Sequence, residues 1–402
     1  MLAPAPVFDP RSPGFISDPY PHYAVLRAHN PVHLTRFRFV IMTRHAHLLE
    51  AYRHPLLSRN IRLWDDFSMW RRGRTDGPLE RMMDNWLVMI DPPRHTPLRA
   101  IHEKVFCAAL FTAAAPVLAE ITGALLAGPR QRGGCDLVAD YADRVPVYLT
   151  CALLDLSRAD WEQFVSWSRA IALTTETFLP RSVLRDGEQA RAAMAEYFAP
   201  LASRRRRQPG DDVLSGLAVT EEAGRRLTDE ELIDSLIFLY QAGHPTSSQL
   251  IALAVHSLLA NPGELDRLRA DPGLLPAAVD ELARYDGPVQ MNDRVATHDL
   301  TLFGVEVTAG QLVRLCIGAA NRDDDRYPGA EKLDVGRRAS GHLGYGHGLH
   351  SCVAAQLGRQ QARAAIAALL EHAPRLRLAA GAHPRFRPSM SNRGLTELHV
   401  EF

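Results

Sequence analysis

Apolar positions recur every three to four residues over most of this chain of 402 residues, which is the period of an amphipathic α-helix. The longest such segment follows Thr228-Asp229-Glu230-Glu231, the arrangement of a capping box at a helix start. Asp91-Pro92-Pro93 is a second expected helix entry. The pattern predicts helices over residues 20–28, 45–52, 96–107, 108–127, 140–154, 158–173, 187–205 and 228–260, and one that ends at 280–285.

Short β patterns are fewer and lie mainly near the two ends of the chain. Residues 32–34 and 39–42 are expected to pair, and residues 300–302 and 305–307 are expected to form a hairpin around Phe303-Gly304. Residues 311–317 form a further strand candidate. The chain is therefore predicted to be mainly α with a minor β portion. No linker or repeat divides it, so residues 1–402 are expected to form a single domain.

The composition excludes several classes of protein. Lys+Arg and Asp+Glu both number 46, so the net charge gives no general attraction to nucleic acid. The five cysteines are scattered and odd in number, which argues against a disulfide framework. No apolar run approaching the roughly 18–20 residues of a membrane span is evident, and the proline-rich residues 1–19 do not resemble a signal peptide. We expect a soluble, cytoplasmic protein without a membrane partner.

Candidate chemistry centres on Cys352. Glycines at 344, 346 and 348 precede it and allow the backbone to approach a flat ligand closely. The residues that follow read as a helix, so the sulfur should lie at a helix N-terminus, which favours the thiolate. A single thiolate in such a loop suits haem iron better than zinc, which needs several protein ligands. The alternative is a buried structural thiol beside an ordinary turn.

The string Tyr345-Gly346-His347-Gly348-Leu349-His350-Ser351-Cys352, followed by Leu357 and Arg359, resembles the haem-ligand signature of the cytochrome P450 family. Tyr345 stands where Phe is usual, Ala354 stands where Gly is usual, and Gly358 stands where Ala is usual. The resemblance extends over essentially the whole chain. It implies the single-domain cytochrome P450 fold and haem b (iron protoporphyrin IX), with Cys352 as the iron ligand.

The resemblance also assigns roles to residues that are unremarkable alone. Glu281 and Arg284 are three apart on a helix and would otherwise be an ordinary ion pair; with Arg337 they match the family's structural triad. The haem propionates need cationic or hydrogen-bonding partners. By family position, the residues that bind the cofactor are His95, Arg99, Arg294, Tyr345, Gly346, His350 and Cys352.

The segment Gln241-Ala242-Gly243-His244-Pro245-Thr246 resembles the family's oxygen-binding groove. The resemblance implies that Ala242 and Gly243 let the helix pass close to the haem, and that Thr246 positions dioxygen and protons. Pro245 stands where the family has an acid, and proline should kink or open the helix. Three accounts stay open: protons reach Thr246 from water, substrate groups or His244; the chemistry needs less proton delivery, as in oxidative coupling or ring closure; or the oxidant is peroxide.

Residues that face a substrate are placed by family position alone. Residues 60–89 would cover the pocket with several aromatic side chains, and residues 174–178 would also line it. Packing in an ordinary core is the alternative for all of them. The candidates are Trp70, Trp86, Met89, Thr175, Phe238, Val289, Met291 and Ser391.

The resemblance implies a haem-thiolate monooxygenase that uses dioxygen for a regio- and stereoselective oxidation of a bulky, natural-product-like molecule, as in secondary-metabolite biosynthesis. Electrons would come from a ferredoxin and a ferredoxin reductase, because no flavin or nicotinamide domain is evident. Two alternatives remain: a peroxide-driven or aryl-coupling haem enzyme, which Pro245 motivates, and a haem protein that binds a ligand without catalysis.

Overall fold

The computed structural model describes residues 6–176 and 180–402. These residues form two compact units, each with its own core. The sheet unit contains the described residues up to Phe67, together with Ala252–Cys352 and Ala380–Leu398; the helical unit contains Ser68–Ile251, Val353–Ala379 and His399–Phe402, less residues 177–179. Cooperative behaviour of residues 1–402 as a single domain stays a prediction.

A five-stranded sheet forms the centre of the sheet unit. Its order is β1 (Val32–Leu34), β2 (Val40–Met42), β8 (Leu312–Cys316), β5 (Met291–Ala296) and β3 (Leu57–Ser58). Only β2 and β8 are parallel, with Val40 opposite Val313. Apolar side chains on β2 and β8 are fully buried, among them those of Val40, Met42, Val313 and Leu315. The expected pair of strands near residue 40 and the strand near residue 314 are confirmed.

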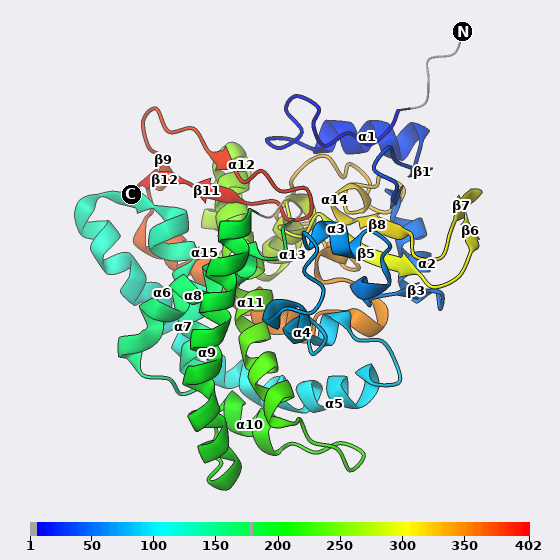
Figure 1. Ribbon diagram of the computed structural model, residues 1–402. Helices are drawn as coiled ribbons and strands as arrows, with labels where there is room; N and C mark the ends of the chain where they lie inside the picture. The colour runs from blue at the N-terminus through cyan, green and yellow to red at the C-terminus, as the bar shows by residue number, and fades with distance from the viewer. Residues whose placement is uncertain (1–5, 177–179) are drawn as a thin grey trace. The chain divides into compact units, whose positions relative to one another are not determined.

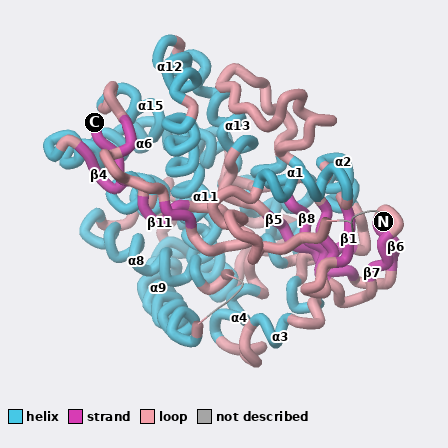
Figure 2. Tube along the Cα trace, turned by 90° about the horizontal axis from the view of Figure 1, so that it is seen from above, coloured by secondary structure: helices cyan, strands magenta, loops and turns pink. Residues whose placement is uncertain are grey.

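Short helices and hairpins surround this sheet, and α1 and α2 run beside its strands in Figure 2. The hairpin of β6 (Leu300–Leu302) and β7 (Val305–Val307) is the predicted one, and Phe303 and Gly304 at its turn both have positive φ. The other elements of this unit are α1 (Tyr20–His29), α2 (His45–Arg53), η1 (Ile61–Leu63), α12 (Pro262–Ala270), η5 (Pro272–Leu274), α13 (Leu275–Tyr285), α14 (Ile317–Ala320), η6 (Leu343–Tyr345), η7 (Gly348–His350), β10 (Arg385–Phe386) and β11 (Leu395–Glu397).

Long helices build the helical unit, where α6, α7, α8 and α9 pack in sequence order (Figure 1). This unit also contains a small antiparallel sheet, in which β12 (His399–Glu401) lies between β4 (Gly134–Asp136) and β9 (Arg377–Leu378). Its helices are α3 (Phe67–Trp70), α4 (Pro78–Met83), η2 (Leu87–Met89), α5 (His95–Val105), α6 (Ala108–Arg132), the π-helical turn η3 (Val138–Ala142), α7 (Arg144–Leu153), η4 (Arg158–Asp160), α8 (Trp161–Leu173), α9 (Arg181–Arg207), α10 (Val213–Val219) and α15 (Ala355–His372).

Helix α11 (Asp229–Ala260) contributes residues to both units. The predicted capping box is present: the backbone N–H of Glu231 donates to the Thr228 hydroxyl, and that of Thr228 donates to the Glu231 carboxylate, both at 3.1 Å. The helix continues through Pro245 without a break. Of the two expected outcomes, a kink or an opening of the helix, the opening does not occur.

Two other expectations fail. The helix after Asp91-Pro92-Pro93 begins at His95, and Arg94 is its N-cap, because the two prolines form a turn before it rather than its first turn.

Helix α6 is long and apolar enough to cross a bilayer by length and composition, contrary to the expectation of no such run. Its buried residues face α7 and α15, which is also how a core helix of a globular protein packs.

Candidate functional site

The glycine-rich loop folds back on itself before Cys352. Gly346 and Gly348 have φ values of 72° and 71°, which side-chain-bearing residues rarely adopt. This geometry brings the backbone N–H of Cys352 to 2.9 Å from the Tyr345 carbonyl oxygen. The Cys352 side chain is exposed, so the buried-thiol alternative is wrong. Helix α15 begins at Ala355, after a short turn, rather than directly after the cysteine.

Two buried side chains anchor the start of this loop. His342 accepts a hydrogen bond from the Gly344 N–H through Nδ1, and its Nε2 lies 3.3 Å from an Asp280 carboxylate oxygen. The side-chain oxygen of Asn321 accepts from the Leu343 N–H at 2.8 Å. Sequence reasoning missed both residues, because Asp280 lies 62 residues from His342 and Leu343 lies 22 residues from Asn321. The loop thus has a fixed entry point before the cysteine.

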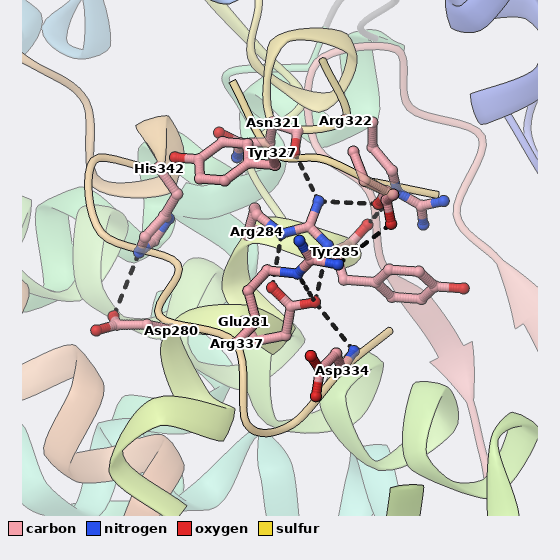
Figure 3. Close-up of polar contacts among 12 residues, drawn as sticks. Asp280, Glu281, Arg284, Tyr285, Asn321, Arg322, Tyr327, Asp334, Arg337 and His342 are labelled. Carbon is pink, nitrogen blue, oxygen red and sulfur yellow. Dashed lines mark hydrogen bonds and ion pairs between the residues drawn. The ribbon is translucent and has the colours of Figure 1, made fainter. Parts of the chain in front are cut away.

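Glu281 is the centre of an ionic cluster, shown in Figure 3, in which Glu281 and Arg284 are fully buried and Arg337 is partly buried. Arg284 binds both of its carboxylate oxygens, at 2.6 and 2.8 Å, and Arg337 donates to one of them at 3.1 Å. The backbone N–H of Asp334 donates to the same oxygen. The structure therefore brings the three predicted triad residues into contact, and every Glu281 oxygen has a charged partner.

The triad connects to the cysteine loop through one residue. Arg284 donates to the backbone carbonyl oxygen of Asn321 at 2.7 Å, and the Asn321 side chain holds Leu343, as described above. Figure 3 shows Asn321 beside Arg284 and Tyr327. Because a bidentate arginine–carboxylate pair has a fixed geometry, Glu281 fixes the orientation of the Arg284 guanidinium as well as balancing its charge. The cluster is thereby connected to the cysteine loop through Asn321.

Changing Gly346 to alanine should weaken the loop specifically. With φ at 72° and ψ at −170°, this residue occupies a region that is nearly exclusive to glycine, and a side chain there costs about 1–3 kcal/mol. We expect lower haem retention in the purified G346A protein, measured from the haem-to-protein absorbance ratio. The control is G381A, which has nearly the same φ, 73°, in a turn away from the loop. Equal haem retention in the two variants would contradict this role.

The middle of α11 has one accessible face and one buried face. The Thr246 hydroxyl donates to the Ala242 carbonyl at 2.8 Å, so the two residues lie together on that helix. Ala242, Gly243 and Thr246 are half-buried, and a Cβ on Gly243 would meet no described atom within 4 Å. Space is therefore available beside Gly243 among the described residues.

His244 lies on the other face of the helix. It is buried, its Nδ1 is 2.7 Å from the Ser168 hydroxyl, and its Nε2 faces Asp143 at 3.7 Å. A separation of two residues turns a helix by about 200°, so His244 points away from Thr246. The account in which His244 hands protons directly to Thr246 is not supported by this geometry.

The predicted propionate partners fall in both units. His95 and Arg99 are one turn apart on α5, and Arg99 also pairs with Glu103 at 2.7 Å. In the sheet unit, Arg294 is buried on β5 and its guanidinium lies 5.0 Å from the ring centre of Tyr52. Arg99 and Arg294 carry permanent positive charge and His95 adds a ring N–H, so the set suits an anionic partner.

The substrate candidates form three groups. Trp86 stacks on Phe238 of α11 with ring centres 5.4 Å apart, and Met89 follows Trp86 in η2. The indole N–H of Trp70 donates to the Glu176 carbonyl beside Thr175, while residues 177 and 178 lie outside the described part of the chain. In the sheet unit, Met291 donates through its backbone to the Ser391 carbonyl at 3.2 Å, and Val289 bridges to Asn392.

The residues present fit the haem that the resemblance implies. No group of three or more His, Cys, Asp or Glu side chains that could hold a metal occurs within residues 6–176 and 180–402. A metal at Cys352 would therefore have fewer than three protein ligands of these kinds, and a porphyrin supplies four nitrogen ligands. The exposed thiol agrees with this donor set.

Comparisons with known proteins give the family. A sequence model of the family "Cytochrome P450" matches residues 160–373. Vitamin D(3) 25-hydroxylase of Pseudonocardia autotrophica is 36% identical over 392 residues, covering 96% of this chain and 94% of that protein. Cytochrome P450 monooxygenase PikC of Streptomyces venezuelae is 35% identical over 380 residues, covering 90% and 86%.

The crystal structure of CalO2 resembles this fold with a TM-score of 0.91 and 32% identity, and covers 99% of both chains. The mainly α architecture with a minor β portion is therefore that of the family, as predicted. The length, fold and cysteine loop agree, so this chain belongs to the cytochrome P450 family and is a haem-dependent oxidoreductase.

Proposed function

We propose that this protein is a soluble, cytoplasmic monooxygenase that oxidises a bulky, natural-product-like molecule with regio- and stereoselectivity. The observation that carries this proposal is the glycine-rich loop, anchored by His342 and Asn321, in which Cys352 is exposed. When bound, haem supplies the cleavage of dioxygen, whose two atoms end in product and in water after uptake of two electrons and two protons.

The protein's residues take the following parts. Cys352 is the iron ligand, and Tyr345, Gly346 and His350 form the surrounding loop. His95, Arg99, Arg294 and His350 hold the propionates by charge or hydrogen bonds. Ala242 and Gly243 leave room beside α11, and Thr246 positions dioxygen and protons. The three groups of substrate candidates described above orient the organic molecule.

Electrons come from outside the chain in this proposal. A ferredoxin and its reductase supply them, as the resemblance to the cytochrome P450 family implies. Support for the substrate class comes from the names of the relatives, a vitamin D(3) hydroxylase and the PikC monooxygenase. Vitamin D3 is therefore a first ligand to test.

Product formation from isotopically labelled dioxygen tests the proposal. A ligand that shifts the ferric absorption spectrum should gain one labelled oxygen atom when a ferredoxin, its reductase and a nicotinamide reductant are added. Oxidation that proceeds from hydrogen peroxide alone, with no gain from the redox partners, would favour the peroxide-driven alternative that Pro245 motivates. A spectral shift without any oxidation under either condition would favour a ligand-binding haem protein.

A further inference from the structure

Helix α11 lacks one backbone hydrogen bond at its centre. Proline has no N–H, so the carbonyl oxygen of Gln241 receives no helical hydrogen bond from Pro245. Proline in a helix interior costs about 3 kcal/mol relative to alanine. Nevertheless, α11 continues from Asp229 to Ala260 without interruption. Contacts from neighbouring helices therefore have to stabilise the turn around Pro245.

A serine on α8 provides the first of these contacts. The Ser168 hydroxyl lies 3.3 Å from the Tyr240 carbonyl oxygen and 2.7 Å from Nδ1 of His244. It thus connects two positions of α11 that are one turn apart, directly before the proline. Ser168 is fully buried, so these two contacts are shielded from water.

A carboxylate at the end of η3 provides the second contact. Asp143 follows that π-helical turn, and its N–H bonds to the Val138 carbonyl at 3.0 Å. One of its carboxylate oxygens accepts from the Ser248 hydroxyl and lies 3.7 Å from Nε2 of His244. The other accepts from Arg169 at 2.6 and 2.9 Å. Asp143 therefore holds α11 on both sides of Pro245.

The three anchored positions form one stripe. Tyr240, His244 and Ser248 are spaced by four residues, so they follow one another along one face over successive turns that include Pro245. The accessible face carries Ala242 and Thr246 instead. Because the helix backbone is rigid, contacts that hold the face of Tyr240, His244 and Ser248 also fix where Ala242 and Thr246 lie along the helix axis and in which direction they point.

The carboxylate in this cluster is charged. Burial alone would raise the pKa of Asp143, but its contacts with His244, Ser248 and Arg169 hold that pKa well below the usual range. A buried carboxylate that loses a partner is strongly destabilising. The cluster consequently has one favoured arrangement, with all partners in place.

We propose that Asp143 and Ser168 clamp α11 across Pro245, and that this clamp positions Ala242, Gly243 and Thr246 for oxygen chemistry. The inference rests on the function proposed above, in which those three residues act. Asp143, Ser168, His244 and Ser248 are positioning residues in this account. The side-chain contacts hold the turns on either side of Pro245, and the Ser168 hydroxyl bonds to the Tyr240 carbonyl oxygen, one residue before the Gln241 carbonyl that loses its helical partner.

A double-mutant cycle measured by hydrogen exchange tests the clamp. S168A should speed exchange of the α11 amides in residues 238–250 by about fivefold, equivalent to about 1 kcal/mol. In the background of P245A, which restores the missing N–H, the same change should speed exchange by less than about twofold. The measurement is made on the purified haem-loaded protein by mass spectrometry. It does not depend on turnover, so it stays readable if the proposed oxidation fails.

Matched variants define the outcomes. S166A removes an exposed serine two residues away on α8 and should leave exchange in α11 unchanged. Equal effects of S168A with and without Pro245 would overturn the proposal, since the clamp would then be unrelated to the proline. Unchanged exchange in S168A alone would overturn it as well. S168A is a small change, so the test does not require a variant that removes the buried charge.

A second pair of variants separates positioning from proton transfer. H244Q keeps hydrogen-bonding atoms but does not titrate near neutral pH, whereas H244L removes the contacts. The clamp predicts that H244Q keeps most of the exchange protection and of the solvent isotope effect on turnover, and that H244L loses the protection. If H244Q keeps the protection but changes the solvent isotope effect as much as H244L does, His244 transfers protons and the positioning account is wrong.

Discussion

Replacing Glu281 with alanine should destabilise the sheet unit by about 3–5 kcal/mol, because Arg284 would remain buried without its bidentate partner. Glu281 and Arg284 have fully buried side chains, and Arg337 is only 17% exposed. A loss of this size is a large part of the 5–15 kcal/mol that stabilises a typical domain. We expect a lower urea midpoint by circular dichroism and little bound haem.

Two further variants make this prediction precise. R337A removes one of the contacts to Glu281 and should give a smaller loss in a protein that still folds. E120A breaks an ion pair between Glu120 and Arg158, both of which are exposed, and should change stability by less than about 1 kcal/mol. A midpoint for E281A that equals that of E120A would show that the triad is not a stabilising cluster.

Changing Cys352 to serine should abolish the thiolate ligand and leave the fold in place. The side chain is exposed, and the hydrogen bond at this residue uses its backbone N–H, which serine retains. A serine hydroxyl is a far weaker iron ligand than a thiolate. We expect C352S to lose the thiolate-type absorption spectrum and monooxygenase activity, with a urea midpoint of the haem-free protein close to that of the parent.

Cys107 supplies a demanding control for this change. It is the N-cap of α6, and hydrogen bonds from the backbone N–H groups of Leu110 and Ala109 lower the pKa of its thiol. Cys107 is thus a thiol at a helix N-terminus with a lowered pKa, and it lies outside the glycine-rich loop. C107S should keep the parent spectrum. Loss of the thiolate spectrum in C107S, with its retention in C352S, would show that Cys107 rather than Cys352 is the metal ligand.

Local sequence patterns predicted the long helices and the cysteine loop well, because both depend on nearby residues. The capping box at Thr228 and the hairpin turn at Phe303-Gly304 are read from a few adjacent positions. Strand β5 was not predicted, since its sequence Met291-Asn292-Asp293-Arg294-Val295-Ala296 does not alternate; its pairing with β8 and β3 defines it. Short helices such as α10 and α12 lack a long periodic signal and were also missed.

The supporting contacts of the site were harder to predict than its chemistry. Asn321 meets Leu343, and Asp143 meets His244, across separations that no local motif marks. The effect of Pro245 shows the same limit. Its local chemistry predicts a kinked or open helix, whereas α11 continues through Pro245, where Ser168 of α8 and Asp143 at the end of η3 contact it. Tertiary packing therefore outweighs the low helix propensity of proline at this position.

The absorption spectrum of the reduced protein with carbon monoxide tests the central claim, that Cys352 ligates haem iron, most directly. The account predicts the strongly red-shifted Soret band of a thiolate-bound haem in the parent protein and in C107S, and its absence in C352S. A band at the position typical of histidine-ligated haem in freshly purified, active parent protein would contradict it. So would a polypeptide that stays colourless after reconstitution with haem.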